Sequence, residues 1–191
     1  MNKPEFQFYP SLLNSYGRFI NGKLSQLELI DKINRVPASV TAPQQKGIDF
    51  ETAIIKGVNE EMFNAELLSE VRALLPRPMV KTQVYCEYRM DNVLVYGFVD
   101  VIGKILAVDL KTTRQYTAGQ YEKDHQNFYL PALKHKGIRA LRYIITDFEQ
   151  VYQENYKAPI DLSFQEMQIK GFCEFVLSNR ELITDKKIFS E

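Results

Sequence analysis

Charged residues interrupt an otherwise apolar stretch in the middle of the chain. The stretch is GFVDVIGKILAVDLKTT, residues 97–113, and its charged members include Asp100, Asp109 and Lys111. A charge buried in a sheet costs several kcal/mol unless it is paired or binds a cation. The pattern therefore indicates either a satisfied ion pair or a functional site, and the hairpin alone leaves both open.

The two-residue segment Gly103–Lys104 predicts a tight hairpin turn, because glycine in the first position is typical of a type II′ turn. Strands paired around this turn would place Ile102 opposite Ile105. Asp100 would then lie opposite Ala107, which leaves room for a bound ion between neighbouring carboxylates.

Alternation along the two strands predicts that Asp100, Asp109 and Lys111 project from one face. The two acids would be diagonal neighbours, with backbones about 7–8 Å apart, so both carboxylates could reach one cation. The other face would be apolar and includes Val99, Val101, Leu106, Val108 and Leu110.

A third acid is predicted on a helix upstream of the hairpin, in KGIDFETAIIKGV. Glu51 falls on the same helical stripe as Ile48, Ile55 and Val58, so it is expected to face the interior. Oxygen-only ligands suit Mg²⁺ or Mn²⁺. The acids expected to converge on such an ion are Glu51, Asp100 and Asp109.

The elements that position these residues follow from the periodicity of the sequence. Helices are expected near 11–19, over 44–75 with a break at Gly57, over 117–136 with a kink at Pro131, and over 163–179, the last opened by a capping box from Ser163 to Glu166. Strands are expected over 80–90, twice within 93–111, and over 138–147. Residues 20–43 and the segment FEQVYQENY are expected to be loops, the latter covering a sheet edge.

This order predicts an α/β fold in which a mixed sheet, with an antiparallel β-meander at its centre and one further strand, is flanked by helices. A length of 191 residues suits one domain over 1–191. Its parts would be an N-terminal segment (1–43), a core (44–147) and a C-terminal loop and helix (148–191).

Composition excludes several classes of protein. The formal net charge is zero, so a nucleic acid would have to be bound by a local basic patch. Two separated cysteines cannot build a four-thiolate zinc or iron–sulfur site. No apolar run reaches membrane-spanning length and MNKPEFQFYP lacks the apolar region of a signal peptide, so we expect a cytoplasmic protein without a membrane partner.

The motifs together resemble the PD-(D/E)XK nuclease superfamily, in particular its RecB-like and phage λ-exonuclease-like branch. The matching segments are GFVD (97–100), DLKT (109–112), QNFY (126–129), KGIDFE (46–51) and the opening YPSLLNSY. The branch usually carries a tyrosine four residues after its glutamine. Here that position is Leu130, and the tyrosine is Tyr129.

The resemblance implies a restriction-endonuclease-like core and hydrolysis of DNA phosphodiester bonds, as an exonuclease in recombination, repair or phage DNA processing. It implies that Mg²⁺ or Mn²⁺ is held by Glu51, Asp100, Asp109 and the backbone carbonyl of Leu110. Lys111 would orient or deprotonate the attacking water, and Gln126, with Tyr129, would complete the catalytic set.

Two other functions remain open at this point. The chain could keep the nuclease fold as a non-catalytic nucleic-acid-binding module, or serve as an interaction subunit of a recombination complex. DNA is the expected partner, a recombinase or single-strand-binding protein is a further one, and a homo-oligomer is compatible with the sequence.

Overall fold

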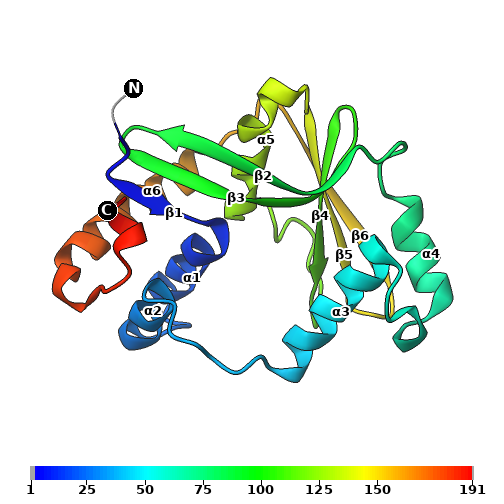
Figure 1. Cartoon of the computed structure of the whole chain (residues 1–191), viewed down its shortest axis with the longest axis horizontal. Helices are drawn as coiled ribbons and strands as arrows, with labels where there is room; N and C mark the ends of the chain where they lie inside the picture. Colours follow the sequence, from blue (N-terminus) through cyan, green and yellow to red (C-terminus); the bar gives the residue numbers. More distant parts are fainter. Residues whose placement is uncertain (1–2, 191) are drawn as a thin grey trace.

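The computed structural model describes residues 3–190 and is built on a six-stranded mixed sheet (Figure 1). The strands are β1 (Phe6–Phe8), β2 (Lys81–Met90), β3 (Val93–Ile102), β4 (Leu106–Thr112), β5 (Ala140–Thr146) and β6 (Val151–Lys157). Their order is β1-β3-β4-β5-β6, and β2 pairs with β3. β1 is parallel to β3 and β4 to β5, whereas the other neighbours are antiparallel. The predicted α/β class with a central β-meander is confirmed.

Helices precede, follow and interrupt the sheet. They are α1 (Pro10–Ile20), α2 (Gln26–Ile33), α3 (Ala42–Lys56), α4 (Ala65–Ala73), α5 (Tyr129–Ala132) and α6 (Ser163–Ser178). Capping boxes begin α2 at Ser25 and α3 at Thr41, while Gly57 ends α3 with φ of 68°. No helix within residues 3–190 is long and apolar enough to cross a membrane.

β3 is the strand on which the sheet is organised. One of its edges pairs with β2 along almost its full length. The other edge is shared: β1 pairs with Val93–Val95, and β4 pairs only with Val101 and Ile102. Within the described residues, 96–100 therefore have no strand beside them on this edge.

The β3–β4 hairpin differs from its predicted register by two residues. Val101 pairs with Val108 and Ile102 with Ala107, where the two-residue turn would have paired Ile102 with Ile105. The turn lies one residue further along the chain, because Gly103 N–H donates to the carbonyl of Leu106, 2.8 Å away, and closes the turn around Lys104 and Ile105. A shift of two residues keeps the parity of the alternation between the two strands.

Other sequence predictions were wrong in ways that local chemistry explains. The segment expected to be a helix over 117–136 is a loop followed by short 3₁₀ and α turns. Asp124 caps a new helical turn that begins at residue 125, and Pro131 lacks the backbone N–H that one continuous helix would need at this position. The expected loops contain α2 and β6. The helix α6 is present, but Leu162 is its N-cap and the predicted capping box does not form. The short strand β1 was also not predicted.

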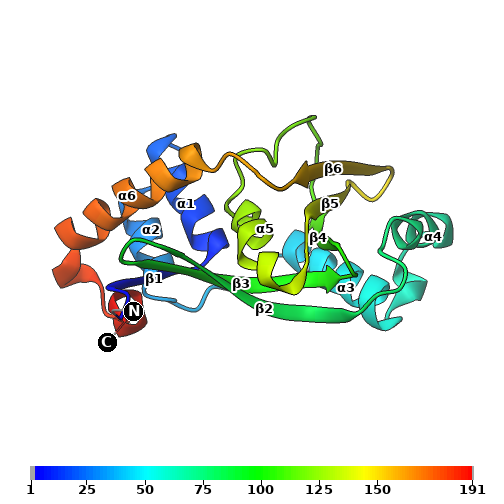
Figure 2. The ribbon, with the colours of Figure 1, turned by 90° about the horizontal axis from the view of Figure 1, so that it is seen from above.

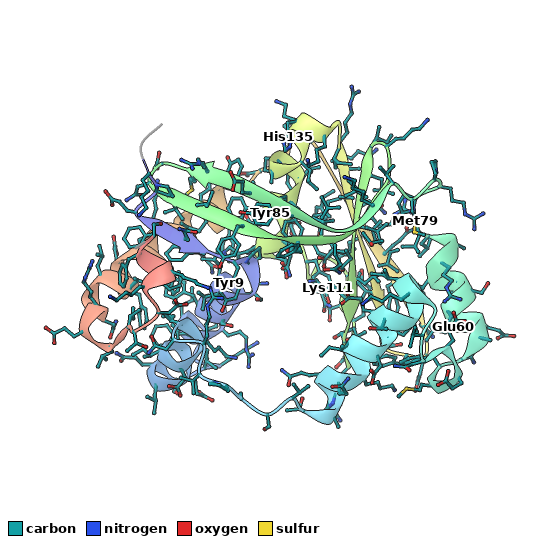
Figure 3. The ribbon with its side chains drawn as sticks, viewed as in Figure 1. Tyr9, Glu60, Met79, Tyr85, Lys111 and His135 are labelled. Carbon is teal, nitrogen blue, oxygen red and sulfur yellow. The ribbon has the colours of Figure 1, made fainter. Side chains whose placement is uncertain are left out.

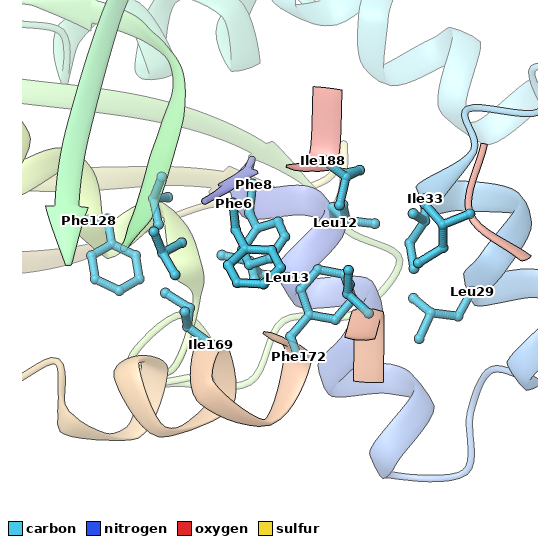
Figure 4. Close-up of a cluster of buried hydrophobic side chains, with 14 of the residues drawn as sticks. Phe6, Phe8, Leu12, Leu13, Leu29, Ile33, Phe128, Ile169, Phe172 and Ile188 are labelled. Carbon is cyan, nitrogen blue, oxygen red and sulfur yellow. The ribbon is translucent and has the colours of Figure 1, made fainter. Parts of the chain in front are cut away.

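Three clusters of buried side chains hold the layers together. The first joins β1, α1, α2 and α6 through residues such as Phe8, Leu13 and Phe172 (Figure 4). The second lies between α5 and the strands β2 to β5, and α5 is seen over one face of the β2–β3 hairpin in Figure 2. The third packs α3 and α4 against the sheet through Phe50 and Val108.

Val99 packs in the second cluster and Val101 in the third. Plain alternation would put both side chains on one face of β3, so the strand twists sharply between them. Asp100 lies at this twist.

Gly97 is required where β3 passes α5. A Cβ built on Gly97 would lie 2.8 Å from Tyr129 Oη and 2.9 Å from its Cε1. We expect Gly97→Ala to lower the free energy of unfolding by about 1–3 kcal/mol through overpacking, measured by urea denaturation.

The control is Gly17→Ala on α1, where the new Cβ would meet only the flexible end of Gln168 at 3.3 Å. That change should be neutral or slightly stabilising, since alanine favours a helix. Pairing Gly97→Ala with Tyr129→Leu should restore part of the loss. Equal stability of Gly97→Ala and wild type would contradict the packing assignment.

Candidate active site

The site forms where β3 and β4 separate. Beyond the pair Val101–Val108, the carboxylate of Asp100 replaces the backbone pairing: its Oδ2 accepts the N–H of Leu110 at 2.7 Å. In a strand, the N–H and C=O of one residue point to the same side. The Leu110 carbonyl therefore also points into the space between the strands.

Glu51 reaches this space from α3. Gln83 of β2 links the two acids, since its Nε2 donates to Glu51 Oε1 at 2.8 Å and to Asp100 Oδ1 at 3.2 Å. One donor thus lies between two carboxylates. Gln83 has a left-handed φ of 49°, an uncommon conformation for a residue within a strand.

The helical stripe used to predict that Glu51 faces the interior was the wrong one, although the Glu51 side chain does point toward the site. Ile48 and Val58 are 51% and 50% exposed, so their stripe is not the buried face of α3. The buried face consists of Phe50, Ala53 and Ile54. Glu51 follows Phe50 around the helix and is half-buried at the edge of this face.

Asp109 and Lys111 form a buried ion pair on β4. Lys111 Nζ lies 2.6 Å from Asp109 Oδ2, and Asp109 is only 4% exposed. Burial opposes the charge of Lys111, but Asp109, Asp124 and Asp100 outweigh it and raise the pKa of the ammonium. Lys111 is therefore a cation in this arrangement. Figure 3 shows it at the centre of the molecule, below the β2–β3 hairpin.

Gln126 contacts the same ammonium. With its amide oxygen toward Lys111, the distance to Nζ is 2.8 Å and the amide nitrogen donates to Asp124. The reverse orientation would set an amide nitrogen against an ammonium, so the first orientation is the chemically consistent one. The structure therefore places Gln126 beside Lys111.

A polar network behind Gln126 was not predicted from the sequence. Asn14 of α1 donates to Asp124 Oδ2 at 3.0 Å, and its Oδ1 accepts the backbone N–H of His125 at 3.1 Å. Asn14 Oδ1 also lies 2.7 Å from Nδ1 of His125, whose pKa burial lowers to about 4. The network fixes the short turn that carries Gln126.

Tyr129 takes a different position from the other predicted site residues. It is buried, and its hydroxyl lies against Gly97 of β3. Burial, and then the negative charge of Asp109, raise the pKa of the phenol far above its usual value. Tyr129 is thus an uncharged side chain that lines the site.

The acids carry a large electrostatic penalty. Burial, with the charge of Glu51, raises the pKa of Asp100 to about 6. Burial and the charge of Asp100 raise the pKa of Asp109 to about 7, although Lys111 opposes this. The pKa of Glu51 is also raised, by burial and then by Asp109.

The predicted residues therefore form two adjacent groups: Glu51 with Asp100, and Asp109 with Lys111 and Gln126. In the described part of the chain, no three His, Cys, Asp or Glu side chains are arranged closely enough to hold a metal ion together. Arg114 lines a pocket beside α3, and Lys134 and Arg139 line a separate cavity beside α5.

No protein-family model matches the sequence, and no curated protein matches it. Among solved structures, a candidate exonuclease from Eubacterium rectale superposes with a TM-score of 0.60 at 11% identity, covering 94% of this chain and 84% of the other. The protein SSO0001 superposes with a TM-score of 0.47 at 14% identity, covering 94% of this chain and 79% of the other. Rai1 from Scheffersomyces stipitis has a TM-score of 0.36 at 15% identity, covering 93% of this chain and 62% of the other.

The two similarities below 0.5 carry no weight. The similarity to the candidate exonuclease, at 11% identity, concerns the fold alone. The chain thus has a mixed α/β fold similar to that of the Eubacterium rectale protein, with its acidic site at the point where two strands of the sheet separate.

Proposed function

We propose that this protein is a metal-dependent nuclease that hydrolyses DNA phosphodiester bonds, acting as an exonuclease in recombination, repair or phage DNA processing. The observation that carries the proposal is the buried Asp109–Lys111 pair beside the carboxylates of Asp100 and Glu51. Perturbed acids and a lysine gathered at one point of a fold are typical of catalytic sites. The fold shared with a candidate exonuclease adds support.

The residues present fit Mg²⁺ or Mn²⁺. Glu51 and Asp100 already converge on one hydrogen-bond donor, the amide of Gln83, at 2.8 and 3.2 Å. Mg²⁺ commonly needs only one or two protein carboxylates, with water and substrate phosphate completing its shell. Glu51, Asp100 and the Leu110 carbonyl would hold the ion, and Asp109 would join them only by moving closer, because the three acids are not close enough to share an ion in this structure. When bound, it would lower the pKa of a water and neutralise charge on the phosphate.

Lys111 supplies a fixed positive charge beside the reacting phosphate. In this role it orients the attacking water, or pairs with a phosphate oxygen, while remaining protonated. Gln126 also contacts the ammonium. Tyr129 limits access of solvent from the α5 side.

Lys111→Ala is expected to lower Mg²⁺-dependent cleavage of an end-labelled linear DNA by about 10²–10⁴-fold. The reason is the loss of the only cation that contacts Asp109 and Gln126 among residues 3–190. Gel analysis of linear and closed circular DNA, with Mg²⁺ or chelator, measures the effect and separates exonuclease from endonuclease action.

Lys104→Ala, in the exposed turn of the same hairpin, is the matched control and should retain wild-type activity. Wild-type cleavage by Lys111→Ala would reduce Lys111 to an ion-pair partner. Absence of any Mg²⁺-dependent cleavage by the wild-type protein would reject the proposed function.

Asp100→Asn is expected to stabilise the protein without metal. The pKa of Asp100 is about 6 when folded and about 3.9 in an unfolded chain, so the folded state binds more protons between these values. Its ionisation therefore destabilises the fold as pH rises through this window. In chelator at pH 8 the variant should gain about 1–3 kcal/mol, and at pH 4 the gain should nearly vanish.

Thermal unfolding at both pH values measures this difference. The side-chain amide oxygen that Asp100→Asn introduces can still accept the Leu110 N–H, so this hydrogen bond between β3 and β4 is preserved. Glu61→Gln changes an exposed carboxylate and serves as the control. A gain that is equal at pH 4 and pH 8 would show that like-charge burial is not its cause.

Calorimetric titration with Mn²⁺ tests the ion site directly. We expect binding by the wild type and loss of most of it in Asp109→Asn, because the variant removes a buried charge from the acidic group. Lys111→Ala should retain binding, since it removes no ligand. Equal binding by wild type and Asp109→Asn would exclude Asp109 as a ligand.

A further inference from the structure

A group of aromatic side chains lies beside the acids, on the open edge of β3. Phe98, 54% exposed, is two residues before Asp100 on the same strand, a distance of about 6.6 Å. Tyr85 of β2 is 47% exposed and meets Phe98 edge to face, with ring centroids 5.6 Å apart. Neighbouring exposed rings of this kind are unusual on a surface that has no ligand.

A pocket of about 280 Å³ adjoins Phe98, close to the lower end of the roughly 300–1,000 Å³ found for ligand pockets. Its lining includes Tyr9, Arg35, Tyr96, Gly97, Phe98 and Tyr129. Tyr129 lines this pocket and also lies near the acidic site, because the negative charges of Asp109 and Asp100 both raise the pKa of its phenol.

Arg35 gives the pocket a positive group. Its guanidinium lies over the ring of Tyr9, 5.3 Å from the centroid, and donates to the hydroxyl of Tyr96 at 3.0 Å. An ion pair of 2.6 Å with Asp185 holds it in place, and Arg35 itself has a left-handed φ of 53°. A guanidinium held beside aromatic rings can contact both a base and a phosphate.

The backbone of β3 completes the surface. Along residues 96–100 the edge shared by β1 and β4 has no strand partner within the described chain. A flexible strand could follow this edge from the pocket to Asp100. A paired duplex could not, because its bases are stacked within the helix and cannot reach the rings.

We infer that the pocket formed by Tyr9, Arg35, Tyr96 and Phe98 binds an unpaired nucleobase of the strand whose phosphate lies at the acids. This inference rests on the proposed function and names its substrate as a single-stranded or frayed end. Stacking on Phe98 and Tyr9 would hold the nucleotide next to the scissile bond, with little preference among bases.

Binding is tested with a single-stranded oligonucleotide that carries 2-aminopurine near one end, in Ca²⁺ buffer. Stacking on the rings should quench its fluorescence. Phe98→Leu and Tyr9→Leu should each weaken the affinity by about 5–100-fold, as expected for the loss of one stacked base. Tyr152→Leu, on β6 at the opposite edge of the sheet, is the matched aromatic control and should bind as the wild type does.

Cleavage provides the second measurement, with matched single-stranded oligonucleotides that have either intact or abasic nucleotides at both ends. The wild type should cleave the abasic substrate about 5–100-fold more slowly, and Phe98→Leu should show little of this difference. The wild type should also prefer single strands to a blunt hairpin duplex, and the variant should lose the preference.

The two proposals fail in different ways. Cleavage of DNA with unchanged affinity and unchanged abasic discrimination in both variants would overturn the stacking pocket and leave the nuclease intact; the rings would then be a contact for a protein partner. Quenching that depends on Phe98 and Tyr9, without any Mg²⁺-dependent cleavage, would support the pocket and reject the nuclease.

Discussion

The early separation of β3 from β4 is the constraint on which the site depends. Only two residue pairs join these strands, after which the Asp100 carboxylate accepts the Leu110 N–H in place of a backbone carbonyl. The partly buried carboxylate of Asp100 thus takes the place of a strand partner, because the N–H of Leu110 has no backbone carbonyl to pair with here. The same separation leaves the Leu110 carbonyl and the edge of β3 facing an accessible space.

This arrangement places like charges together at a point where water is limited. Burial raises the pKa of both Asp100 and Asp109, and each acid strengthens the effect on its neighbours. Gln83 and Lys111 reduce part of this electrostatic repulsion. Gln83 donates a hydrogen bond from its amide, and Lys111 supplies a positive charge. Neither neutralises all the acids. The fold therefore stores an unfavourable electrostatic energy that a cation would reduce, as is common at functional sites.

The sequence was sufficient for the fold class, for strands β2 to β5 and for the acids on β3 and β4, because hydrophobic alternation reports which face of a strand is buried. It missed β1 and β6. It was not sufficient for the register, since the position of the turn after Ile102 depends on a hydrogen bond from Gly103. The roles of Gln83 and Asn14 could not be predicted. Asn14 lies in the matching segment YPSLLNSY and Gln83 in a strand, but each role comes from contacts with residues far along the chain.

Glu51 illustrates the limit of periodicity. The stripe used to place it, with Ile48 and Val58, is exposed, whereas the adjacent stripe through Phe50 is buried. On a helix the two stripes differ by about 100° of rotation, and a short apolar pattern does not separate them. The short 3₁₀ turn with Gln126 was likewise hidden, because a turn set by the Asp124 cap leaves little periodic pattern.

The charge of the site also determines the order in which its ligands can bind. Four carboxylates, those of Glu51, Asp100, Asp109 and Asp124, surround the single ammonium of Lys111. A phosphate approaching these acids alone would meet a net negative field, and Lys111 is already engaged by Asp109. Association of a polyanion at this point therefore requires that positive charge be added first. In the proposed function a divalent cation would supply it, while Arg35, in the adjoining pocket, would hold the strand at a distance from the acids. A site of this kind would engage nucleic acid firmly only when metal is present.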